Sequence, residues 1–173
     1  DEWTANKHWM LSAGVRTNFS KAFGFMWMPK IAVKYSPDEH WAIRANYSMG
    51  YRAPSIKELF FNWDHLGMFQ IRGSEDLKPE KNHYFSLGAE YTHNGFFMNV
   101  NAYINKFRNK IEGVWHIYDM QYNFEYTNLS SQRLYGIEAI LKWHFLDHFT
   151  LNGTYSYVNV SKQDGIQVNT TSP

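Results

Sequence analysis

The sequence predicts an all-β fold, an antiparallel up-and-down meander of long strands. Two observations carry this prediction. Apolar and polar residues alternate with period two over long stretches, and tight turns are interspersed with much longer connections. A third observation is compositional, because aromatic residues make up 18% of the 173 residues although the mean hydropathy is −0.53. Apolar side chains are therefore spread regularly, as they are on one face of strands.

The first three strands are predicted at residues 9–20, 25–35 and 41–52, which are runs of eleven or twelve residues. In each run every second position is mostly apolar, as Trp9 and Leu11 are at the start of the first run. Strands of soluble proteins usually have about 5–6 residues. At about 3.3 Å per residue and a tilt of about 45°, such a run rises roughly 25 Å, which is the height of the apolar band of an outer-membrane barrel.

The same alternation returns after a gap and gives about seven strands in all. The later runs lie at residues 85–92, 96–105, 135–145 and 149–157, and short additional strands are expected near Ile111–Ile117 and Tyr122–Tyr126. Tight turns rich in Asp, Asn, Gly and Pro separate some neighbours, at residues 36–40, 92–95 and 146–148. Aromatic residues gather near these turns, and we expect a girdle there, since Tyr and Trp favour membrane interfaces. Its predicted members are Tyr35, Trp41, Tyr91, Phe96, Trp143, Phe145 and Phe149.

Two connections are long, at residues 53–82 and 110–132. Short turns at one end of the strands and long loops at the other are typical of outer-membrane barrels. Residues 1–173 are therefore predicted to form one partial barrel domain. Amphipathic strands with many aromatic residues also build soluble sandwiches and lipocalin-like barrels, whose apolar face points inward. Strand length and unequal connections favour the membrane barrel.

Composition narrows the function. The net charge of +1 implies no nucleic acid or other polyanion as partner, and the absence of cysteine excludes disulfides and cysteine-based sites. No apolar run reaches 18 residues and no signal peptide opens the chain, which begins and ends in mid-pattern. We expect a piece of a longer protein. No phosphate loop or metal-ligand spacing is present, so we expect no enzyme activity, no metal site and no cofactor.

Two segments carry a family resemblance: "SMGYRAPSIKELFF" at residues 48–61 and "GSEDLKPEKNHYFSLGAEY" at residues 73–91. Together they resemble the C-terminal half of TonB-dependent outer-membrane receptors, in which a Tyr-Arg-Ala-Pro-Ser strand end leads to a long loop and a Leu-Lys-Pro-Glu element opens the next strand. "YINKFRNKIEG" and "YGIEAILKW" follow in the same order. The motif positions expected to be structural are Tyr51, Arg52, Pro54, Glu58, Leu77, Lys78, Pro79 and Glu80.

The resemblance implies part of an active transporter in the outer membrane of a Gram-negative bacterium, taking up a scarce ligand such as an iron-siderophore. It implies membrane lipid, the energy-transducing TonB protein and a small ligand as partners. The plug domain that fills the lumen in this family is absent from these residues. A soluble all-β binding domain is the main alternative, and a passive porin is the third.

Ligand contacts are expected in the long loops, because loops carry function on a rigid scaffold. The candidates are Trp63, His65, Phe69 and Arg72 in the first loop and Trp115, His116 and Tyr118 in the second. Near the strand end, Tyr51 is expected at the outer interface, Arg52 toward the lumen or rim, and Pro54 as the residue that ends pairing, since proline has no N–H to donate. The apolar side chains of Ile56, Leu59, Phe60 and Phe61 are expected to pack inside the folded loop.

The isolated chain presents a physical problem. Strands 9–20 and 149–160 are predicted as open edges, and one whole face of the sheet is apolar. We therefore expect the chain to be oligomeric when it is taken out of lipid or detergent.

Overall fold

The computed structural model of the chain describes residues 1–118, 121–145 and 148–163. They divide into two compact units. The sheet unit comprises the described residues of 1–50, 83–106 and 133–161, and the loop unit comprises those of 51–82 and 107–132 together with Lys162 and Gln163. No helix in the described residues is long and apolar enough to cross a membrane.

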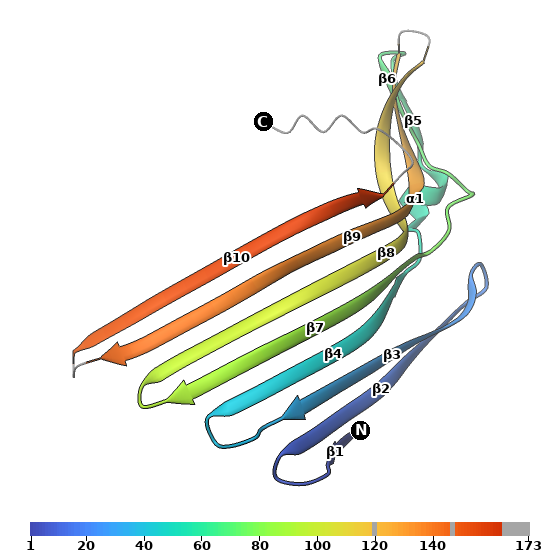
Figure 1. Cartoon of the computed structure of the whole chain (residues 1–173). Coiled ribbons are helices and arrows are strands. Elements are labelled where there is room, and N and C mark those ends of the chain that lie inside the picture. The colour runs from blue at the N-terminus through green and yellow to red at the C-terminus, as the bar shows by residue number, and fades with distance from the viewer. Residues whose placement is uncertain (119–120, 146–147, 164–173) are drawn as a thin grey trace. The chain divides into compact units, whose positions relative to one another are not determined.

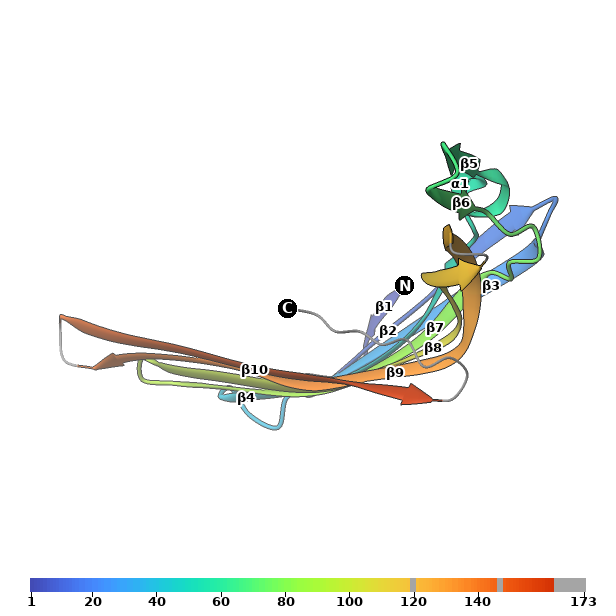
Figure 2. The same cartoon turned by 90° about the horizontal axis from the view of Figure 1, so that it is seen from above.

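The sheet unit is a single layer of antiparallel strands (Figures 1 and 2). Its strands follow the chain in the order β1, β2, β3, β4, β7, β8, β9 and β10. Their full bounds are β1 Glu2–Thr4, β2 Trp9–Ser20, β3 Gly24–Tyr35, β4 Trp41–Arg52, β7 Glu80–His93, β8 Phe96–Tyr118, β9 Gln121–Phe145 and β10 Phe149–Gln163. The predicted meander is confirmed, and the additional strands expected near Ile111–Ile117 and Tyr122–Tyr126 are present as extensions of β8 and β9.

Turn chemistry fixes the register of the strands. Asn94 and Gly95 both have positive φ, 44° and 76°, as the two central residues of a type I′ hairpin turn require. Before β4, the Asp38 carboxylate accepts hydrogen bonds from the backbone N–H groups of His40 and Trp41, at 2.8 and 2.9 Å. Short polar side chains thus replace backbone partners where the chain reverses.

The pairing of β2, β3 and β4 places the mostly apolar positions of the three strands on one face and the mostly polar positions on the other. Ala13 pairs with Ile31, which pairs with Tyr47. Lys34 pairs with Met10 on one side and with Arg44 on the other. One face of the sheet is therefore apolar and the other polar, and we call them the apolar face and the polar face.

Large side chains on the apolar face remain exposed in the described structure. The most exposed on β2 and β3 include Val15, Phe19 and Phe25, at 64%, 72% and 64%. On the polar face, Arg44 forms an ion pair with Glu90 at 2.9 Å. An apolar face that no described residue covers is what a strand surface in contact with lipid requires.

Six of the seven predicted members of the aromatic girdle near the tight turns form a continuous series of rings. Trp41 and Tyr91 have ring centroids 4.8 Å apart, and Trp143 and Phe145 have centroids 5.0 Å apart. Phe96 bridges these pairs, at 6.1 Å from Tyr91 and 6.5 Å from Trp143. The series continues to Phe149, and Tyr35 packs separately on Trp9.

One predicted edge needs correction. Residues 9–20 were expected to be an open edge, but Trp3 of β1 pairs with Leu11, and its neighbours extend this pairing from Met10 to Ser12. The short β1 was not predicted because three residues are too few to show alternation. At the other side, β10 pairs with β9 and has no second neighbouring strand among the described residues.

The loop unit contains helix α1 (Ile56–Phe60) and the hairpin of β5 (Asn62–His65) and β6 (Phe69–Arg72), which lie together in Figure 2. Strand β6 also pairs in parallel with the start of β9, where Phe69 lies opposite Tyr122. The connection at 53–82 thus contains regular elements, and the connection at 110–132 consists largely of the extended arms of β8 and β9.

The loop unit has a small apolar core of its own. Leu77, Ile111 and Val114 are exposed by only 4%, 7% and 5%, and Pro54 is buried as well. The prediction that Ile56, Leu59, Phe60 and Phe61 pack inside the loop is wrong for three of them, because Phe61 is also exposed, at 37%. Ile56 is 80% exposed and Phe60 is 60% exposed, and α1 has no buried residue. The core is built by the Leu-Lys-Pro-Glu element and β8 instead.

Candidate functional site

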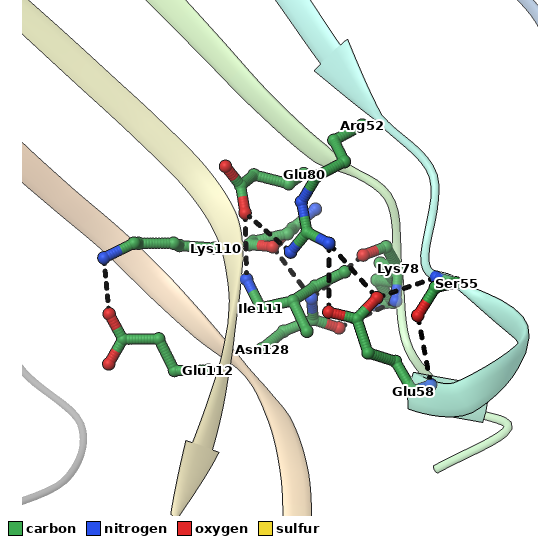
Figure 3. Close-up of polar contacts among 10 residues, drawn as sticks. Arg52, Ser55, Glu58, Lys78, Glu80, Lys110, Ile111, Glu112 and Asn128 are labelled. Carbon is green, nitrogen blue, oxygen red and sulfur yellow. Dashed lines mark hydrogen bonds and ion pairs between the residues drawn. The ribbon is translucent and has the colours of Figure 1, made fainter. Parts of the chain in front are cut away.

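The end of β4 is held by a polar cluster, defined as Arg52, Ser55, Glu58, Glu80 and Asn128 (Figure 3). Arg52 Nη1 donates to both carboxylate oxygens of Glu58, at 2.9 and 3.1 Å, and Nη2 donates to Glu80 at 3.3 Å. The same Glu80 oxygen accepts the backbone N–H of Ile111 at 3.2 Å. One arginine therefore connects the strand end, the helix and the start of β7, and Glu80 continues the connection to β8.

Ser55 and Glu58 form a capping box at the start of α1. The Glu58 backbone N–H donates to Ser55 Oγ at 3.2 Å, and the Ser55 backbone N–H donates to the Glu58 carboxylate at 2.7 Å. Two backbone donors that the helix leaves unpaired are thereby satisfied. Pro54 precedes the cap and is buried, and β4 ends at Arg52, so the predicted role of this proline at the strand end is consistent with its position.

The ionisation of Glu58 follows from these contacts. Burial alone would raise the pKa of its carboxyl group, but the hydrogen bonds from Ser55 and Arg52 and the charge of Arg52 outweigh burial and lower it. The Glu58 and Glu80 side chains are only 14% and 15% exposed, and Arg52 is 45% exposed. The two carboxylates depend on the single guanidinium for their counter-charge, because a largely buried charge is costly without a partner.

Asn128 was not predicted as a structural residue, yet it joins three segments of the loop unit. Its side-chain amide donates to the carbonyl groups of Lys78 and Asn109, at 2.9 and 2.8 Å, and its oxygen accepts the Lys78 N–H at 2.7 Å. Asn109 has a φ of +52°, a conformation that asparagine tolerates better than most residues. No local pattern could identify Asn128, because its partners lie far away in the sequence.

Four of the predicted ligand-contact residues come together in an aromatic cluster, defined as Trp63, His65, Phe69, Trp115, Phe124 and Tyr126. The rings of Trp63, His65 and Phe69 lie 5.0–5.4 Å apart on the β5–β6 hairpin. Phe69 reaches Trp115 of β8 at 6.3 Å. Trp63 and Trp115 remain 42% and 55% exposed, so this cluster has apolar surface available to a ligand.

Phe124 and Tyr126 extend the cluster and were not predicted as contacts. Phe124 lies 5.0 Å from Trp115 and 5.1 Å from Tyr126, measured between ring centroids. Its ring covers Gly113, where an added Cβ would come within 1.9 Å of the Phe124 ring. Gly113 is therefore required for the ring to lie against β8, a contact that the glycine alone could have suggested.

The remaining candidates lie elsewhere. Arg72 ends β6, where it pairs with Asn62 on one side and Glu125 on the other. His116 follows Trp115 in β8 and so points to the opposite side of that strand. The side chain of Tyr118 lies outside the described residues. No group of three His, Cys, Asp or Glu residues suited to a metal ion occurs in the part of the chain that the structure describes.

Most of the predicted motif residues belong to the core or the polar contacts of the loop unit. Leu77 lies in its core, Lys78 binds Asn128 through its backbone, Pro79 follows, and Arg52, Glu58 and Glu80 form the ion pairs. Tyr51 precedes Arg52, and its hydroxyl group is buried without a hydrogen-bond partner among the described residues.

Comparison with known proteins gives the family. The family model "TonB dependent receptor-like, beta-barrel" matches residues 1–173. The "Iron-regulated outer membrane virulence protein" of Vibrio cholerae is 27% identical over 95% of this chain, which spans 27% of that relative's length. The "Ferric enterobactin receptor" of Pseudomonas aeruginosa is 29% identical over 60% of the chain and 15% of its own length. The chain thus spans about a quarter or less of these curated relatives.

A solved structure gives the same fold. The siderophore receptor PirA from Pseudomonas aeruginosa matches with a TM-score of 0.83 at 18% identity, over 93% of this chain and 33% of that one. The strand pattern had left a soluble all-β domain and a passive porin open as alternatives. The family model that matches every residue favours the receptor barrel over both. The strand register, the loop motif and the match over every residue lead to one conclusion: the chain belongs to the TonB-dependent receptor family and is part of the β-barrel by which that family lies in the bacterial outer membrane.

Proposed function

We propose that the protein containing this chain is an outer-membrane receptor that takes up a ferric siderophore and is energised by the TonB protein. We further propose that the aromatic cluster contributes to capture of the ligand. The observation that carries the proposal is the convergence of Trp63, His65, Phe69 and Trp115, predicted from separate loops, on one partly exposed surface.

The chemistry of the cluster suits an iron chelate with aromatic rings. Offset and edge-to-face contacts between rings contribute about 0.5–1.5 kcal/mol each beyond the area they bury. Ferric enterobactin presents catechol rings and a negative charge. One relative of this chain is named a ferric enterobactin receptor, and another is named an iron-regulated outer-membrane protein. Arg72, at the end of β6, offers a cation in the same unit.

Binding of ferric enterobactin to the complete protein tests the role of the cluster. We expect the Trp63→Ala, Trp115→Ala double variant to bind roughly tenfold more weakly, since two ring contacts are lost. Trp143→Ala, which removes a ring of the girdle in the sheet unit, is the matched control and should leave binding unchanged. Equal affinities of the double variant and the native protein would show that the cluster does not contact this ligand.

Gly113→Ala gives a second, independent variant. The added methyl group displaces the Phe124 ring without removing an aromatic residue. We expect weaker binding with unchanged insertion into the membrane, measured as the amount of heat-modifiable protein in the outer-membrane fraction.

Uptake by cells distinguishes an energised receptor from a porin. Cells that lack TonB should still bind ferric enterobactin through this protein but should not accumulate iron from it. Accumulation that is independent of TonB would contradict the proposed mechanism even if the aromatic cluster binds the ligand.

A further inference from the structure

The apolar face of the sheet unit ends in a row of basic residues on three neighbouring strands. The Asn94-Gly95 turn pairs His93 with Phe96. In this antiparallel pair, ten residues before His93 in β7 lie opposite ten residues after Phe96 in β8, so His83 lies opposite Lys106. The contact of Gly88 with Asn101 agrees with this register. These strands lie side by side in Figure 1.

The pairing of β8 with β9 extends the row. The His144 N–H donates to the Gly95 carbonyl at 2.9 Å, which pairs these residues in an antiparallel ladder. Lys106 is eleven residues after Gly95 in β8, and Arg133 is eleven residues before His144 in β9, so Lys106 lies opposite Arg133. The Tyr103 ring lies within 3 Å of a Cβ placed on Gly136, as this register requires.

Strict alternation sets the face on which the row lies. Lys106 follows Met98, Ala102 and Ile104 on the apolar face, and Arg133 precedes Tyr135 and Ile137 on that face. His83 is placed there directly: its ring stacks on Tyr47 at 6.1 Å, and Tyr47 also packs on Phe85 at 4.8 Å. The basic row, His83, Lys106 and Arg133, therefore adjoins an apolar row formed by Phe85, Ile104 and Tyr135.

The charges of this row have no acidic partner among the described residues. Lys106 is partly exposed and Arg133 is exposed, and no described carboxylate lies within 4 Å of either. The carboxylates within the sheet strands, such as Glu90 and Glu138, alternate onto the polar face. Like charges directly opposite each other on neighbouring strands destabilise a sheet, so this pair calls for an external anion.

His83 can supply a neutral donor to the same anion. Tyr47 Oη lies 3.0 Å from His83 Nδ1. When the tyrosine hydroxyl donates to Nδ1, the neutral imidazole carries its proton on Nε2 and offers an N–H there. An ammonium, a guanidinium and an imidazole N–H together match the oxygen atoms of a phosphate group.

We propose that the row His83–Lys106–Arg133 binds the phosphate group of an anionic lipid headgroup in the outer membrane. The apolar row beside it would contact the acyl chains of the same lipid, and the basic residues would lie at headgroup level. The site is independent of the ligand that the receptor takes up, because it lies on the apolar face of the sheet unit and involves no residue of the aromatic cluster.

The test is a lipid titration of the complete protein in dodecyl maltoside micelles. The probe is diphosphoryl lipid A, with phosphatidylcholine as the zwitterionic comparison. Each basic residue near a membrane surface strengthens binding to anionic lipid about fivefold, so the Lys106→Gln, Arg133→Gln variant should bind the probe about 30-fold more weakly. The charge-matched control is Lys30→Gln, Lys34→Gln, which changes two lysines of the polar face and should leave the affinity within about twofold.

Thermal unfolding separates binding from a structural role. Without lipid, the double variant should be as stable as the native protein or more so, since a like-charge pair is removed. The charge-preserving Lys106→Arg, Arg133→Lys variant should retain affinity. The proposal fails if the double variant binds lipid A as tightly as the native protein, if phosphatidylcholine binds equally well, or if millimolar inorganic phosphate displaces lipid A, which would indicate a site for free phosphate.

Discussion

The sheet unit and the loop unit differ in which side chains they bury. In the sheet unit, large residues such as Phe19 and Trp27 are exposed, and the buried positions are small ones such as Ala42 and Ser86. In the loop unit, Leu77, Ile111 and Val114 are buried, and the charged residues pair around Arg52. The difference follows from the solvent: a surface in lipid needs no covering layer, whereas a loop in water must build its own core.

The largest effect is expected from a charge on the apolar face. Ile31 lies near the middle of β3. The substitution Ile31→Arg should destabilise the membrane-inserted protein by about 2–4 kcal/mol. Ser12→Arg is the matched control, because Ser12 is on the polar face beside Glu2. Urea unfolding from lipid vesicles measures both. Equal costs for the two variants would mean that the two faces have the same surroundings.

Loss of Arg52 should disrupt the loop unit. Arg52→Ala leaves Glu58 and Glu80 without their shared counter-charge, at a cost of about 2–3 kcal/mol, reduced from the value for a fully buried pair because Arg52 is partly exposed. Limited proteolysis between residues 53 and 82 should become faster. Arg44→Ala, which breaks the ion pair with Glu90 on the sheet, should cost less than about 1 kcal/mol and leave that cleavage unchanged.

The capping box gives a smaller effect. Ser55→Ala removes the oxygen that accepts the Glu58 N–H and should cost about 1 kcal/mol. Ser55→Asp should retain the cap, since aspartate serves equally well at this position. Native-state hydrogen exchange of the α1 amides would measure the difference, and identical exchange in Ser55→Ala would contradict the assigned cap.

The pH dependence of the loop unit should be the smallest effect. The folded-state pKa of Glu58 is lowered, so its contribution to stability is complete above the unfolded value of about 4.3 and is lost as the pH falls through the folded pKa. Proteolysis of the loop with an acid-active protease should therefore accelerate as the pH falls below the unfolded value of about 4.3. Glu58→Gln should weaken this dependence, and a dependence of undiminished size in that variant would assign it to another group.

The sequence predicted the sheet unit well because its information is local. Strands 9–20 and 41–52 agree with the structure at both ends, since period-two alternation and Asp or Gly turns lie within the segments themselves. The loop unit was harder. The parallel pairing of Ile71 with Phe124 joins residues that are far apart in sequence, and the exposure of Ile56 contradicts its apolar character.

The candidate site was predicted only in part, because some of its residues are identified by local sequence and others only by contacts between distant segments. Aromatic residues such as Trp63 and Trp115 stand out in long connections, so composition alone marked them. Phe124 belongs to the cluster because its ring lies against Gly113. Asn128 belongs to the loop unit because its side chain donates to the backbone carbonyl groups of Lys78 and Asn109. These contacts depend on how β8 and β9 pair, which no single segment encodes.

Site-directed spin labelling tests the contrast between the units most directly, and it is practicable because the chain contains no cysteine. Single cysteines placed at each position from 26 to 33 and at positions 62–65 would be labelled in lipid vesicles, and the accessibility of each label to oxygen and to a water-soluble nickel complex would be measured. Along β3, odd positions such as Ile31 should favour oxygen and even positions the nickel complex, while positions 62–65 should favour nickel throughout. Oxygen accessibility without alternation along β3, or alternation with the opposite phase, would contradict a lipid-facing apolar surface.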